Sequence, residues 1–156
     1  MNAIAAAQAL TVARANIWDV FAIRGLEHAC FGRDAYDFFA LLELLISPKM
    51  MRLKAMLNGR MVGFVAGELN RHEKNGWIVT LGVQPNCESQ GIGTRLLLDC
   101  EQMMAVPLIK LTVRKSNTRA IKLYEHHGYT FVHTIARYYN DGEDGLLMEK
   151  RVNGES

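Results

Sequence analysis

The 156-residue chain contains little of what marks several common classes of protein. It has only three cysteines, Cys30, Cys87 and Cys100, which lie far apart and form no CxxC pair. An odd, widely spaced set of this kind indicates neither a disulfide framework nor a zinc site. We therefore expect a cytoplasmic protein that holds no metal.

Excess charge and long apolar runs are also missing. Eighteen Lys and Arg against sixteen Asp and Glu give a net charge of +2, and the basic residues are scattered. Nucleic-acid binding typically needs a concentrated basic surface, and a membrane span needs roughly 20 consecutive apolar residues. The Ala-rich beginning lacks the basic segment of a signal peptide, because its first arginine is Arg14. We expect no nucleic-acid or membrane partner and read residues 1–8 as a flexible tail.

The remaining composition, 49% hydrophobic and 22% charged, is that of a globular protein, so we expect one domain over residues 1–156. Apolar spacing predicts helices at 17–31, 34–47 and 117–128 and a helix that follows the glycines near residue 91 and ends near residue 104. Asp34 and Asn117 suit helix N-caps, Ser47-Pro48 a helix end and Gly128 the position after one. Alternating or apolar runs predict strands at 10–14, on both sides of Asn58-Gly59 within 50–70, and at 75–85, 108–114, 129–139 and 146–152. The order β-α-α-β-β-β-α-β-α-β-β indicates an α/β fold with a mixed sheet of about seven strands and four helices.

The segment Cys87-ESQGIG places Gly91 and Gly93 between a strand and a helix. The first N–H groups of a helix have no intrahelical partners, and glycine lets an anion approach the backbone closely. A dinucleotide fingerprint would need glycine where Leu96 stands, and the Gly-Lys-Ser/Thr of a P-loop is absent. The segment favours another kind of phosphate site, and the alternative is an ordinary tight turn.

Several motifs together resemble the GNAT superfamily of acetyl-CoA-dependent N-acetyltransferases. The run TLGVQPNCESQGIGTRLL is similar to its motif A, whose loop reads Gln/Arg-x-x-Gly-x-Gly/Ala. The runs 111–129 and 137–148 resemble the ribosomal-protein alanine N-acetyltransferases (RimI) and the eukaryotic N-terminal acetyltransferase catalytic subunits. The likeness is close over residues 76–148 and loose before them. It implies the GNAT fold.

The resemblance also implies where acetyl-CoA binds. The pantetheine would lie along Leu81, Gly82 and Val83, where a main-chain N–H would stabilise the oxyanion. Gly82 would mark a β-bulge that frees this donor, or would only admit a close neighbour in the sheet. The pyrophosphate would meet the N–H groups of Ser89, Gln90, Gly91, Ile92, Gly93 and Thr94. Asn117 would contact the cofactor in addition to capping its helix.

Catalytic roles follow from the same resemblance. Tyr124 aligns with the tyrosine that protonates the departing thiolate, and the alternative is that it only packs against its own helix face. RimI enzymes carry a glutamate base where this chain has Thr112, which cannot act as a base near neutral pH. Glu27 in the first helix is our candidate base, and its alternative is a solvated helix residue. No cysteine is placed as a nucleophile, so the resemblance implies direct attack of the amine on acetyl-CoA.

The acceptor is best described as a protein or peptide N-terminus. Tyr138 and Tyr139 match paired tyrosines that hold the substrate backbone in the peptide branch, although strand aromatics often only pack on a sheet. An α-amine has a pKa of about 7.8 and lysine one of about 10.4, a difference of roughly 3.5 kcal/mol for removal of the proton. Without a strong base, an N-terminal amine is the better substrate. A small-molecule amine and a non-catalytic acyl-CoA-binding module stay open, as do a monomer and a homodimer.

Glu88 and Ser89 stand where relatives often carry basic residues. If main-chain N–H groups hold the phosphates, the carboxylate of Glu88 must face solvent. The change Glu88→Arg should then lower the Michaelis constant for acetyl-CoA.

Overall fold

The computed structural model describes residues 9–152, so the predicted tail at residues 1–8 lies outside it. Seven strands form one sheet, and they are β1 (Leu10–Arg14), β2 (Met50–Leu57), β3 (Arg60–Asn70), β4 (Asn75–Val83), β5 (Leu108–Arg114), β6 (Thr130–Ile135) and β7 (Gly145–Arg151). The α-helices are α1 (Val20–Phe31), α2 (Phe38–Ile46), α3 (Ile92–Met104) and α4 (Thr118–His126). Short 3-10 turns are η1 (Ile17–Asp19), η2 (Gly32–Asp34) and η3 (Pro85–Cys87). The predicted order of strands and helices is confirmed.

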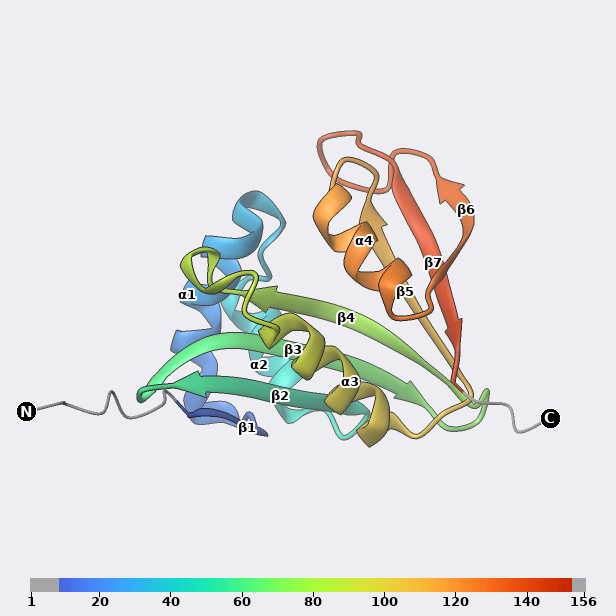
Figure 1. Cartoon of the computed structure of the whole chain (residues 1–156). Coiled ribbons are helices and arrows are strands. Elements are labelled where there is room, and N and C mark those ends of the chain that lie inside the picture. Colours follow the sequence, from blue (N-terminus) through green and yellow to red (C-terminus); the bar gives the residue numbers. More distant parts are fainter. Residues whose placement is uncertain (1–8, 153–156) are drawn as a thin grey trace, which may run out of the picture.

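The sheet has the order β1-β2-β3-β4-β5-β7-β6 and is antiparallel except between β4 and β5. The predicted hairpin is present, with Asn58-Gly59 joining β2 to β3. Helix α3 packs on one face of β2, β3 and β4, whereas α1 and α2 lie on the other face (Figure 1). One core cluster accordingly joins α3 to the sheet, and a second joins α1 and α2 to Phe64 and Ala66 of β3. No helix within residues 9–152 is long and apolar enough to span a membrane.

The two central parallel strands separate soon after they meet. Strand β4 pairs with β5 only from Asn75 opposite Leu108 to Trp77 opposite Lys110. Beyond this point the strands diverge, and α4 lies beside the opening (Figure 1). The edge of β4 from residue 78 to residue 83 therefore faces an opening rather than a neighbouring strand, which leaves backbone groups there available to a ligand.

Two local predictions were wrong. Asp37, not Asp34, caps α2, because its side chain accepts the Ala40 N–H at 2.8 Å. Strand β6 ends at Ile135 rather than at residue 139, and Arg137 takes a positive φ of 53°. The predicted strand aromatics Tyr138 and Tyr139 thus lie in the loop between β6 and β7.

The irregularity expected at Gly82 is elsewhere in β4. Gly82 pairs normally with Phe64, and the register shift lies where Ala66 and Gly67 face Thr80 and Ile78, which leaves Val79 without a partner. A Cβ on Gly82 would approach Sγ of Cys30 to 3.1 Å and the Phe31 ring to 3.3 Å. Gly82 therefore admits a close neighbour, but that neighbour is α1 and not the sheet.

Candidate active site

The loop after β4 presents backbone N–H groups at the start of α3. Gly91 is the N-cap with a left-handed φ of 79°, and no side chain caps this helix end. Ser89 also has a positive φ, of 66°, in a region that side chains seldom enter. The first-turn donors of α3 are therefore uncapped, and the helix dipole adds partial positive charge. This end of α3 is suited to an anion.

A cleft of about 550 Å³ runs from this loop along β4 to α4. It is lined by all but one of the residues expected to bind the cofactor, namely Leu81, Gly82, Val83, Ser89, Gly91, Ile92, Gly93, Thr94 and Asn117. The exception is Gln90, whose side chain is exposed. Asn117 also caps α4, since its side chain accepts the Ala120 N–H at 3.2 Å. The predicted cofactor residues thus share one long cleft.

A second cavity, of about 200 Å³, adjoins the first on the side of α1 and the β6–β7 loop. Its walls include Glu27, Tyr36, Thr80, Tyr138 and Tyr139. Both cavities are lined by Phe31, Leu81, Asn117, Ala120 and Tyr124. The molecule therefore has a long cleft and a small pocket that meet at a shared wall.

Tyr124 belongs to this shared wall. Its side chain is only 8% exposed, and its ring packs edge-on against Tyr129 at 5.5 Å. No described residue hydrogen-bonds its hydroxyl group, whereas the Tyr129 hydroxyl donates to Glu101 at 2.9 Å. Burial raises the pKa of Tyr124 well above its ordinary value. The phenol therefore stays protonated near neutral pH and keeps a free donor at the cavity junction.

Glu27 lies in the wall of the small pocket with 2% of its surface exposed, so the alternative of a solvated helix residue was wrong. Its Oε1 accepts a hydrogen bond from Oγ1 of Thr80 at 2.6 Å, and its Oε2 faces the Tyr36 N–H at 3.5 Å. Burial raises the pKa of Glu27, and the bond from Thr80 partly opposes this. Its position could have been foreseen, because Glu27 follows Val20 and Ile23 on the apolar stripe of α1. Thr112 lines the same pocket but supplies no base.

An ion-pair cluster that the sequence did not reveal closes one side of the small pocket. The Arg114 guanidinium donates to Asp34 at 2.6 and 2.8 Å, to Asp141 at 2.9 and 3.0 Å and to Glu143 at 2.8 Å. The Tyr139 ring lies 4.2 Å from the guanidinium carbon. This cluster joins the α1–α2 connection, β5 and the β6–β7 loop, three parts that are distant in sequence. Asp34 therefore holds the pocket wall in place instead of capping α2.

Residues 17–129 match the model of the acetyltransferase (GNAT) family. This match covers most of the chain. The chain belongs to the acetyltransferase (GNAT) family.

Similar sequences and structures extend the match beyond these residues. The GNAT chain is 30% identical, over 92% of its own length and 79% of the relative's, to the catalytic subunit of the N-terminal acetyltransferase A complex of Arabidopsis thaliana. It superposes with a TM-score of 0.84 and 23% identity on the ribosomal-protein alanine N-acetyltransferase of Escherichia coli, covering 95% of this chain and 98% of that one. It also superposes with a TM-score of 0.78 and 16% identity on the PaiA N-acetyltransferase of Thermoplasma acidophilum, solved with coenzyme A, covering 92% and 99%. The two structural matches show the fold, and the GNAT prediction made from the sequence is confirmed.

Proposed function

We propose that this acetyltransferase transfers the acetyl group of acetyl-CoA to the N-terminal α-amine of a protein or peptide. The observation that carries this proposal is the placement of two buried groups, Glu27 and Tyr124, in the wall of one small pocket that adjoins the long cleft. A carboxylate can accept the proton of the amine, and a protonated phenol can supply one to the departing thiolate. The acid and the base then act in one direct transfer of the acetyl group from acetyl-CoA to the amine, in a ternary complex.

The long cleft fits the cofactor in shape and in chemistry. The uncapped N–H groups of α3 suit the pyrophosphate, and the open edge of β4 along Leu81 to Val83 suits the pantetheine arm. The PaiA enzyme, which has the same fold, was solved with coenzyme A. Acetyl-CoA supplies the activated acetyl group, and the chain orients it toward the small pocket. No metal is part of the proposal.

In the small pocket we assign Glu27 the role of general base. Its raised pKa lies closer to that of an α-amine, which makes it a better proton acceptor than an exposed carboxylate. The α-amine is already partly neutral at physiological pH, so the chemical demand on this base is modest. Tyr138 and Tyr139 line the pocket and would position the peptide backbone. Thr112 plays no part in proton transfer.

The N-terminal acceptor has support from the relative in Arabidopsis thaliana, whose name states N-terminal acetylation and which shares most of its length with this chain. A non-catalytic acyl-CoA-binding module is a weaker reading, because Glu27 is buried at a cost to folding that such a module has no reason to keep. The three cysteines are unpaired, which supports our proposal of a cytoplasmic protein. We also propose that residues 1–156 form a single domain, as a monomer or homodimer.

The deciding experiment is a CoA-release assay across matched acceptors. One peptide is offered with a free N-terminus and no lysine, again with that N-terminus acetylated, and again acetylated but with one internal lysine. A small polyamine completes the set. We expect release only with the free N-terminus. Turnover confined to the lysine peptide or the polyamine would contradict the proposed acceptor, and wild-type protein that fails to bind acetyl-CoA would contradict the proposal as a whole.

A further inference from the structure

The cationic side chains of the long cleft come from one helix. Three cationic or titratable side chains, Arg119, Lys122 and His126, line it from α4. Their spacing of three and four residues places them along one face of the helix. The glycine-containing loop opposite supplies only one charged residue to the cleft, Glu88. The positive charge that an anionic cofactor needs is thus displaced from the loop to the facing helix.

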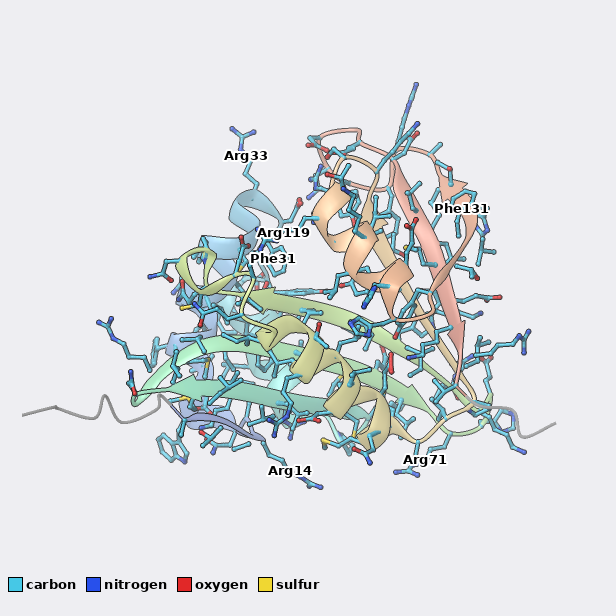
Figure 2. The ribbon with its side chains drawn as sticks, viewed as in Figure 1. Arg14, Phe31, Arg33, Arg71, Arg119 and Phe131 are labelled. Atoms are coloured by element: carbon cyan, nitrogen blue, oxygen red, sulfur yellow. The ribbon has the colours of Figure 1, made fainter. Side chains whose placement is uncertain are left out.

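Arg119 reaches from α4 to that loop. Its NH1 lies 2.6 Å from Oε2 of Glu88, and its NH2 donates to Oγ of Ser89 at 2.8 Å. Figure 2 shows Arg119 in the gap between α4 and the loop that precedes α3. Glu88 is exposed, and its carboxylate also pairs with Arg119. The contact with Ser89 holds the guanidinium next to the uncapped start of α3.

The Glu88–Arg119 pair is weak enough to exchange partners. The Arg119 side chain is 58% exposed and that of Glu88 38% exposed, so water screens their attraction. A pyrophosphate carries more negative charge than a carboxylate and offers the guanidinium a bidentate partner. A phosphate placed on the α3 N–H groups would meet Arg119 at the same loop.

On the basis of the proposed function, we propose that Arg119 is the side chain that binds the acetyl-CoA pyrophosphate and that Glu88 competes with the pyrophosphate for it. Glu88 then weakens cofactor binding in two ways. It repels the phosphates directly, and it holds Arg119 until they displace it. The second effect requires Arg119. Removal of Arg119 should therefore abolish the competition and leave only the direct repulsion.

Isothermal titration with acetyl-CoA tests this with four variants: Glu88→Gln, Arg119→Gln, the double variant, and Glu125→Gln. The last removes the same charge from an exposed position of α4 outside the cleft. We expect Glu88→Gln to lower the Kd about two- to fivefold, which is the scale of an exposed charge pair. Arg119→Gln should raise it about tenfold, because a hydrogen bond to a charged group is lost. Glu125→Gln should leave it unchanged.

The double variant decides between competition and repulsion. With Arg119 absent, Glu88→Gln should give a clearly smaller gain than it gives in the wild type. An equal gain in both backgrounds would overturn the competition, and an unchanged Kd in Arg119→Gln would overturn the assignment of Arg119. Both outcomes presuppose a wild-type protein that binds acetyl-CoA. Absence of that binding would instead count against the proposed function.

Discussion

The hydroxyl group of Thr80 in β4 donates a 2.6 Å hydrogen bond to the carboxylate of Glu27 in α1, across 53 positions of sequence. This bond joins the helix layer to β4, the strand that runs along the long cleft, and it lies in the wall of the small pocket. It fixes the orientation of the carboxylate, and it partly opposes the rise in the pKa of Glu27 that burial causes. Thr80 is therefore a positioning residue for the proposed base.

Replacing Glu27 by Gln should remove the base while keeping an acceptor for Thr80. We expect kcat to fall about 10²- to 10⁴-fold, the usual contribution of a general base. Stability should change in the opposite direction. A carboxyl group with a raised pKa favours folding while protonated, and this contribution is lost as pH rises through its pKa in the folded state. The melting temperature of the variant should therefore exceed that of the wild type at pH 8 by more than at pH 4.

The matched control is Glu43→Gln, which removes the same charge from an exposed position of α2. Neither turnover nor the pH dependence of its melting temperature should differ from the wild type. Full activity in Glu27→Gln would exclude Glu27 as the base.

Replacing Thr80 by Val should shift the pH profile rather than abolish turnover. The bond from Thr80 lowers the pKa of Glu27, so its loss should raise that pKa further. Because the deprotonated carboxylate is the active form, the acidic limb of the kcat profile should move to higher pH. The measurement is kcat at saturating substrates from pH 5 to pH 9. A uniform loss of activity at every pH would indicate that Thr80 only supports packing.

A comparison of Tyr124→Phe with Tyr129→Phe should distinguish the proposed acid from its structural neighbour. The hydroxyl of Tyr124 has no described partner, so the variant should fold normally and lose about 10²-fold or more in kcat. Tyr129→Phe removes a buried hydrogen bond to Glu101, so it should lower the free energy of unfolding by about 1–3 kcal/mol with little effect on kcat. Single-turnover acetyl transfer and urea unfolding measure the two effects. If the variants behaved alike in both assays, Tyr124 would not be the acid.

Parts of this molecule could be predicted from sequence because their signals are local. The hairpin at Asn58-Gly59 and the cap at Asn117 each depend on a few adjacent residues, and the glycine loop before α3 combines turn chemistry with a periodic helix. Local signals were less decisive where two candidates compete. Asp34 and Asp37 are both suitable N-caps, and only the partner of Asp34 in the folded chain shows which one caps α2.

The remaining features depend on contacts between distant segments. Asp34 and Arg114 lie 80 positions apart, and Glu88 and Arg119 meet across the cleft. No periodicity or turn motif encodes such pairs, because they form only after the layers have packed. Glu27 is an intermediate case, since its place on the apolar stripe of α1 signalled burial but not the presence of Thr80.

The Arg114 cluster predicts which peptides the small pocket accepts. Every guanidinium nitrogen of Arg114 already donates to a carboxylate, so its positive charge is shared among Asp34, Asp141 and Glu143. One arginine among the three carboxylates Asp34, Asp141 and Glu143 leaves a formal local charge of about −2. Peptides with Lys at positions two and three should therefore have a higher kcat/KM than matched peptides with Glu there.

Asp141→Asn tests this preference with little disturbance, because the Asp141 side chain is 55% exposed and the amide oxygen can keep the two hydrogen bonds that Oδ1 accepts from Arg114 and from the Glu143 N–H. A single exposed charge interaction has a small effect, so the Lys-to-Glu ratio should fall about 1.4- to fivefold in the variant. The ratio should also fall in the wild type as salt is raised, since screening weakens the same interaction. A ratio that favours Glu peptides, or one that neither salt nor Asp141→Asn changes, would mean that this cluster shapes the pocket wall without selecting the acceptor by charge.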